Sequence, residues 1–132
     1  MPPDELAREI VQQMLHATHV VQRRFSQIAT PLDFVSSDEG LDRLDAICMQ
    51  LIALGESTKN LDKVTDGQLL SQYPEIEWRR MMGMRDFLSH HYFDLNEDIV
   101  FNVCQKHIPR LQRELEHMLA ELDNRTDTDS AA

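Results

Sequence analysis

The chain has 132 residues and a formal net charge of −10 at pH 7, with 42% hydrophobic and 27% charged residues. This length is enough for one domain with its own hydrophobic core. The acidic balance argues against a general, non-specific nucleic-acid-binding protein, which is normally basic, but it does not exclude a small local basic site. Only four glycines and five prolines are present, which disfavours a sheet-rich fold with many tight turns.

The sequence gives little sign of a membrane span, a signal peptide or a redox motif. No segment approaches the run of about 20 apolar residues that a membrane-spanning helix requires. The first residues do not show the basic-then-apolar order of a signal peptide. Cys48 and Cys104 lie far apart in the sequence and form no Cys-x-x-Cys motif, which is typical of a reducing compartment. We therefore expect a cytoplasmic protein that makes no membrane contact.

Apolar residues recur every three or four positions over long stretches, which is the pattern of amphipathic helices. The expected long helices cover residues 6–28, about 37–61, 74–92 and 97–122. No stretch of useful length alternates as a strand does. The sequence therefore predicts an all-α fold, an antiparallel four-helix-type bundle with a short extra helix, as a single domain over residues 1–123.

Several residues give these helices their expected boundaries. Ser36-x-x-Glu39 has the form of a capping box for the second helix. Gly55 interrupts that helix and is expected to allow another helix to approach closely. Pro109 should bend the last helix, because proline lacks the backbone N–H. Residues 124–132 are small and polar, and we expect them to form a disordered tail.

Metal-binding patterns are incomplete. Three pairs have the three-residue spacing that places two ligands on one helix face: Glu114 with His117, His16 with His19, and Cys104 with His107. A di-metal helical bundle needs a second Glu-x-x-His motif and further carboxylates, and this chain has no second motif. We interpret these pairs as solvent-facing helix residues and expect no metal ion or other cofactor.

Nucleophilic sites are no better supported. Cys48 falls on the apolar stripe of the second helix and is interpreted as a small core residue. Ser89 lacks the sharp strand-to-helix turn of a nucleophile elbow. A glycine-rich loop that could cradle phosphates is absent.

The stretch from Met84 to Tyr92 contains the densest group of potentially catalytic side chains in the chain. Met81 and Leu88 form part of a core-facing stripe, and on one continuous helix Arg85 would lie beside them on the packed face. A buried guanidinium is costly unless it is paired or borders a cleft. His90 lies about 140° around the same helix from Arg85. We therefore expect that the helix ends near His90 or that a second copy of the chain completes the site.

These side chains suit phosphate chemistry. Histidine can exchange a proton near neutral pH, and arginine can bind a phosphate. The two need no metal to cleave RNA if the ribose 2′-hydroxyl is the nucleophile. Composition alone favours a plain helix end, where His90 and His91 are solvated and Arg85 pairs with a carboxylate such as Asp86.

The motif Arg85-x4-His90-x-Tyr92 is similar to the signature of HepT-like toxins, a branch of the HEPN superfamily of helical ribonucleases. The segments around the motif resemble the same family in the right order: Leu54–Lys59, Pro74–Arg85 and Asp98–Leu111. Together they extend the resemblance to roughly residues 40–115.

The resemblance implies a metal-independent endoribonuclease toxin of a prokaryotic toxin–antitoxin pair. Such proteins form homodimers whose two motifs face one another across a cleft. Arg85 and His90 would correspond to the catalytic pair that cleaves RNA to cyclic-phosphate ends. Asp86 stands where HepT-like proteins usually carry asparagine, and it would support the motif. Tyr92 matches the tyrosine to which a cognate minimal nucleotidyltransferase antitoxin transfers AMP.

Two other functions remain open at this stage. One is a non-catalytic HEPN module that binds a nucleotidyltransferase partner without cutting RNA, which the acidic charge and Asp86 would suit. The other is a plain dimerisation bundle, which is disfavoured because it leaves Arg85 on the apolar face without a role.

Overall fold

The computed structural model describes the backbone of residues 3–90 and 96–131. Its three long helices are α1 (Pro3–Phe25), α2 (Asp38–Val64) and α6 (Ile108–Ala131). The shorter elements are η1 (Pro31–Phe34), η2 (Leu70–Gln72), α3 (Trp78–Met82), α4 (Met84–His90), α5 (Glu97–Asn102) and the π-helical turn η3 (Val103–His107). The described residues contain no strand, so the all-α prediction is confirmed.

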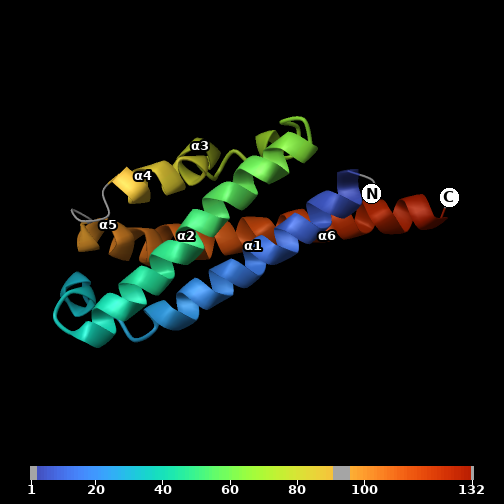
Figure 1. Ribbon diagram of the computed structural model, residues 1–132. Coiled ribbons are helices and arrows are strands. Elements are labelled where there is room, and N and C mark those ends of the chain that lie inside the picture. The colour runs from blue at the N-terminus through green and yellow to red at the C-terminus, as the bar shows by residue number, and fades with distance from the viewer. Residues whose placement is uncertain (1–2, 91–95, 132) are drawn as a thin grey trace.

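The three long helices form the body of the molecule. α1 packs along both α2 and α6 and runs antiparallel to them (Figure 1). The side chains between these helices are fully buried and almost all apolar, and they include Ile47, Leu54, Leu111, Leu115 and Met118. α3 and α4 instead pack mainly against α2, on the side away from α1.

The start of α2 differs from the expected capping box by one residue. Ser37, not Ser36, is the N-cap, and its hydroxyl accepts a hydrogen bond from the Gly40 amide at 3.0 Å. A Cβ atom on Gly40 would lie 2.0 Å from the Asp33 carbonyl oxygen. The backbone of η1 therefore packs directly on the first turn of α2, and this contact selects the register between two adjacent serines that are equally good caps.

The expected single helix over residues 74–92 is wrong, because the segment forms two short helices. Residues 74–77 make a turn, and the Trp78 indole donates a hydrogen bond to the Tyr73 carbonyl at 2.9 Å across it. α3 then ends at Met82, and the amide of its C-cap residue Gly83 donates a hydrogen bond to the Arg79 carbonyl at 3.0 Å. α4 begins at Met84 as a separate element.

The close approach expected at Gly55 is confirmed. A Cβ atom there would lie 2.6 Å from the Met81 carbonyl oxygen and 3.3 Å from the Met84 Cβ. The junction between α3 and α4 therefore rests directly on the backbone of α2. Only a residue without a side chain leaves room for that contact.

The last predicted helix is also divided. The Asn96 side chain caps α5 by accepting a hydrogen bond from the Asp98 amide at 2.8 Å. The distortion lies in η3, just before Pro109 rather than at it. A proline donates no amide hydrogen bond to the preceding turn, which fits a wider π-type turn at this point.

α6 continues through the segment that was expected to be a tail. It is helical to Ala131, whereas we expected no regular structure from Asn124 onward. No glycine or proline interrupts residues 124–131. The Arg125 side chain also donates a hydrogen bond to Gln72 at 3.4 Å, which links this part of α6 to η2.

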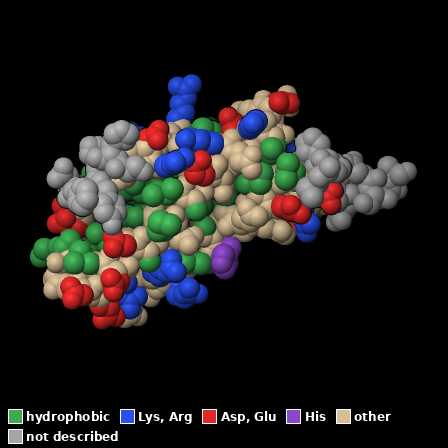
Figure 2. All heavy atoms as spheres, viewed as in Figure 1, with side chains coloured by type: hydrophobic (Ala, Val, Ile, Leu, Met, Phe, Trp, Pro, Cys, Tyr) green, Lys and Arg blue, Asp and Glu red, His purple; other side chains and the backbone are tan. Residues whose placement is uncertain are grey.

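Acidic and basic side chains lie interspersed on the face shown in Figure 2, which has no large region of one charge. Within the described part of the chain, none of the helices is long and apolar enough to span a bilayer.

Candidate active site and an adjoining groove

Arg85 lies in the first turn of α4 and is exposed, with 60% of its side-chain surface accessible. Our prediction that it would lie on the packed face is therefore wrong. Met81 and Leu88 are buried as predicted, but the break at Gly83 separates them into two helices. On α4 alone, Arg85 stands about 60° around the helix from Leu88, at the edge of the buried face.

Arg85 pairs with Glu56, from the middle of α2. The Arg85 Nη1 atom lies 3.7 Å from the Glu56 Oε1 atom. Lys59, one turn further along α2, places its Nζ atom 3.6 Å from the same oxygen. One carboxylate oxygen therefore lies close to two cations, one from each helix.

This arrangement agrees with the alternative in which Arg85 pairs with a carboxylate, although the example named there was Asp86 and the partner here is Glu56. Glu56 lies on another helix, α2, and Asp86 is an exposed residue of α4. Sequence reasoning did not assign a role to Glu56 or Lys59. The available signal was their position beside Gly55, the residue that brings α4 against α2.

His90 is the last residue of α4, so the backbone places it on the same helix as Arg85. Five residues along an α-helix correspond to about 140° of rotation, which puts the two positions on different sides of α4. The described part of α4 ends at His90, and the expected helix end near this residue stays a prediction. His91 and Tyr92 lie outside the described residues.

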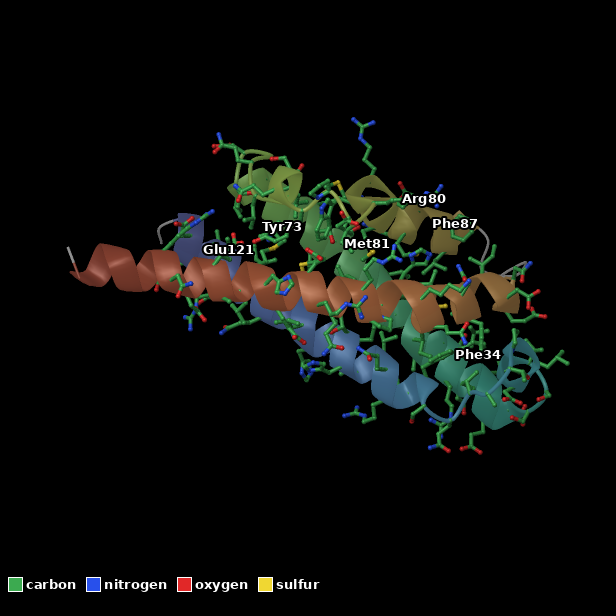
Figure 3. The ribbon with its side chains drawn as sticks, turned by 180° about the vertical axis from the view of Figure 1, so that it is seen from behind. Phe34, Tyr73, Arg80, Met81, Phe87 and Glu121 are labelled. Carbon is green, nitrogen blue, oxygen red and sulfur yellow. The ribbon has the colours of Figure 1, made fainter. Side chains whose placement is uncertain are left out.

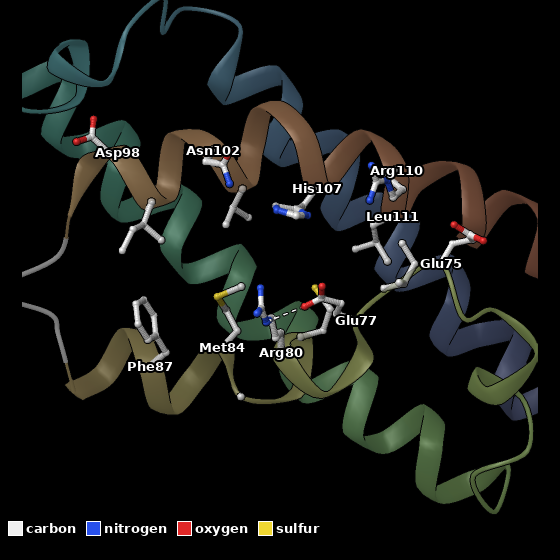
Figure 4. A pocket seen from close by; sticks show the side chains of 15 residues that line it. Glu75, Glu77, Arg80, Met84, Phe87, Asp98, Asn102, His107, Arg110 and Leu111 are labelled. Carbon is white, nitrogen blue, oxygen red and sulfur yellow. Dashed lines mark ion pairs between the residues drawn. The ribbon is translucent and has the colours of Figure 1, made fainter.

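A groove of about 660 Å³ lies beside α4 (Figure 4). One wall is formed by α3 and α4, and the opposite wall is formed by α5, η3 and α6. Met84 and Phe87 point into it from α4, and His107 points into it from the opposite wall. Along the groove, the Arg80 Nε atom forms an ion pair with the Glu77 carboxylate at 2.7 Å. The size and the mainly apolar lining are typical of a binding site.

Tyr73, which directly follows η2, is buried beside Glu121 of α6 (Figure 3). Burial and the neighbouring Glu121 carboxylate raise the pKa of the Tyr73 hydroxyl well above its usual value. The tyrosine therefore stays protonated and acts as a neutral structural contact.

The two cysteines are buried in the core, as expected for Cys48. Burial and the nearby Asp45 carboxylate raise the pKa of Cys48 to about 11. Burial and the neighbouring Cys48 raise the pKa of Cys104 to about 12. Both thiols are therefore protonated at neutral pH and are poor nucleophiles. Because Cys104 is buried, its interpretation as a solvent-facing residue is wrong.

The other pairs considered as metal ligands lie on the surface. His16, His19 and His117 are exposed, and Glu114 is half-buried. No group of three or more potential ligands comes together among the residues that the structure describes.

Comparisons with known proteins indicate the family of this chain. Residues 14–118 match the family model described as "Ribonuclease HepT-like". A "Putative RNase" of Methanocaldococcus jannaschii is 30% identical over 78 residues, which are 59% of this chain and 61% of that protein. A protein of the same description from Caldanaerobacter subterraneus subsp. tengcongensis is 34% identical over 87 residues, or 66% of this chain and 71% of that protein. No solved structure gives a significant match.

The described helices form an all-α bundle of the HEPN type. The matched family model covers most of the chain, so this protein belongs to the HepT-like ribonuclease family. A "Probable ribonuclease HepT" of Thermococcus cleftensis is 34% identical over 73 residues, which are 55% of this chain and 63% of that protein. The chain thus spans about six tenths of the length of several relatives that it matches.

Proposed function

We propose that this chain is a metal-independent endoribonuclease toxin of a toxin–antitoxin pair, with Arg85 and His90 as its catalytic residues. The single observation that best supports this function is the exposed Arg85 on α4 of a chain that belongs to the HepT-like ribonuclease family. An exposed guanidinium can bind a phosphate without prior unfolding or removal from a packed core.

The proposed chemistry uses the ribose 2′-hydroxyl as the nucleophile. Its oxygen attacks the adjacent phosphorus atom while the bond from phosphorus to the 5′-oxygen breaks. His90 either accepts the 2′-hydroxyl proton or gives a proton to the leaving 5′-oxygen. Arg85 binds the phosphate and stabilises its developing charge. The products are a 2′,3′-cyclic phosphate and a 5′-hydroxyl.

The positions of the two residues on α4 favour a homodimeric site. Residues 85 and 90 are about 140° apart around one short helix. One phosphate is therefore more easily contacted by Arg85 of one protomer and His90 of the other than by both from one chain. In this proposal the two motifs face one another across a cleft between protomers.

Control of the toxin is proposed to act at Tyr92. The resemblance of the Arg-x4-His-x-Tyr motif supports transfer of AMP to this tyrosine by a cognate minimal nucleotidyltransferase antitoxin. Tyr92 is two residues from His90 in the sequence, so a bulky, negatively charged AMP group on it would obstruct a phosphate-binding cleft.

RNA cleavage in the presence of a metal chelator tests the catalytic assignment. We expect the wild type to cleave RNA under these conditions and to leave cyclic-phosphate ends. Arg85→Ala and His90→Ala should each reduce the rate by about a hundredfold or more. Arg79→Ala is the matched control, because Arg79 is an exposed arginine of the neighbouring helix α3.

Growth on induced expression in bacteria tests the toxin assignment. The wild type should arrest growth, and Arg85→Ala should relieve the arrest. If His90→Ala cleaved RNA as fast as the wild type, the assignment of His90 as the catalytic histidine would be wrong.

The groove favours a second candidate function, a non-catalytic HEPN module that binds a nucleotidyltransferase partner. Phe87 and Ile99 are large apolar residues that are 40% and 43% exposed at this groove. An apolar groove of this kind can receive a helix of another protein. Absence of both RNA cleavage and growth arrest, together with tight binding to a nucleotidyltransferase that is lost in Ile99→Asp, would favour this function over the enzyme.

A further inference from the structure

Two cations from different helices share one carboxylate oxygen beside the proposed active site. The Glu56 Oε1 atom lies 3.6 Å from the Lys59 Nζ and 3.7 Å from the Arg85 Nη1. The two nitrogens are therefore no more than about 7 Å apart, because both lie near the same atom. All three side chains are exposed by 44% or more, so solvent and ligands can reach them.

The approach of the helices at Gly55 fixes this arrangement. Glu56 follows Gly55 directly, and the Gly55 backbone is in contact with Met81 and Met84. Arg85 is the next residue after Met84. The two backbones are therefore held together one residue from Glu56 and Arg85 and about one helical turn from Lys59, so Lys59 and Arg85 stay close even when Glu56 moves.

We propose that a phosphate of the RNA backbone binds between Lys59 and Arg85 and takes the place that the Glu56 carboxylate has in the free protein. This proposal deepens the proposed ribonuclease function by adding Lys59 as a phosphate-binding residue and Glu56 as a competing anion. An anionic oxygen between a lysine and an arginine is the arrangement that a bound phosphate oxygen would adopt.

The energetics suit exchange of the carboxylate for a phosphate. Ion pairs at exposed positions contribute little to stability, so displacing Glu56 costs little. A phosphodiester can accept the bidentate hydrogen bonds of the Arg85 guanidinium, and the longer carboxylate distance of 3.7 Å does not use them. In a chain with a net charge of −10, a competing carboxylate would also limit binding of unrelated anions.

The test is the binding of a single-stranded RNA analogue whose 2′-hydroxyls are replaced by hydrogen, so that it cannot be cleaved by the proposed route. Affinity is measured by fluorescence anisotropy across a range of salt concentrations. We expect Lys59→Gln to weaken binding about three- to tenfold and to reduce the salt slope by about 0.7, as loss of one phosphate contact requires. We expect Glu56→Gln to tighten binding about fivefold at low salt.

Lys63→Gln is the matched control. Lys63 is an exposed lysine of the same helix, one turn beyond Lys59, and it has the same charge. It should change the affinity by less than twofold. Circular dichroism melting of each variant identifies any loss of fold, which these exposed substitutions are not expected to cause.

The direction in which Glu56→Gln changes the RNA affinity shows whether Glu56 competes with the phosphate or holds Arg85 in place for it. If Glu56 only held Arg85 in place, its removal would weaken binding, and the proposal would be overturned. The proposal also fails if Lys59→Gln has the same affinity and salt slope as Lys63→Gln. These outcomes are separate from the ribonuclease test, since cleavage that depends on Arg85 but not on Lys59 would leave the proposed function intact.

Discussion

The bundle of α1, α2 and α6 differs in its packing from the α3–α4 arm, residues 78–90. Each long helix of the bundle is in contact with another over many turns and contributes fully buried side chains. The arm consists of helices of five and seven residues that pack mainly on α2 and leave a groove toward α6. Helices this short are not stable by themselves and depend on tertiary contacts.

The difference shows where this molecule can change without losing its fold. The proposed catalytic residues and one wall of the groove are on the arm, and most of the fully buried side chains lie in the bundle. Local opening of the arm should therefore cost less free energy than global unfolding. Substitutions in the two regions should separate stability from activity.

The largest expected effect on stability is that of Leu115→Ala in the bundle. Leu115 is fully buried on α6, and its truncation should lower the free energy of unfolding by about 2–5 kcal/mol. Met84→Ala in the arm removes a half-buried side chain and should cost roughly 1 kcal/mol. Urea unfolding followed by circular dichroism measures both. Equal losses would mean that the arm is as integral to the fold as the bundle is.

A smaller effect on stability and a larger one on activity are expected for Gly55→Ala. The new Cβ would lie 2.6 Å from the Met81 carbonyl oxygen, so α2 and the arm must separate. Overpacking costs about 1–3 kcal/mol, and the better helix propensity of alanine offsets up to about 1 kcal/mol of this. We expect a modest loss of stability but at least tenfold slower RNA cleavage, because Arg85 moves with the arm. Unchanged cleavage would contradict this coupling.

Sequence periodicity predicted the bundle well because its helices are long. Many turns of α1, α2 and α6 repeat the same apolar spacing, so their existence did not depend on any one residue. The boundary at Ser37 was missed by one residue because Ser36 and Ser37 are equivalent caps, and only the packing of η1 on Gly40 selects between them.

The arm was predicted less well because its structure depends on contacts between segments far apart in the chain. The pattern from Met81 to Leu88 is helical on both sides of Gly83, and it does not reveal a break between two helices. The pairing of Arg85 with Glu56 depends on how α4 crosses α2, which local spacing cannot specify. The resemblance to a family identified the motif residues, but their arrangement required the fold.

The smallest expected effect is that of Gly83→Ala, which is the counterpart of Gly55→Ala on the arm itself. Gly83 has a right-handed backbone with φ of −81°, so an L-residue can adopt its conformation without strain. A Cβ atom there would lie 3.5 Å from the Arg79 carbonyl oxygen, which is an ordinary contact. Alanine would also reduce the conformational freedom of the unfolded chain and should stabilise the protein by about 0.4–1 kcal/mol.

Cleavage by Gly83→Ala should remain within about twofold of the wild type if the break between α3 and α4 is set by packing on α2 rather than by the glycine. The unfolding midpoint and the cleavage rate, measured beside Gly55→Ala, decide this. A large loss of cleavage with unchanged stability would instead mean that α3 and α4 move relative to one another during the reaction, and that Gly83 supplies the freedom for that motion.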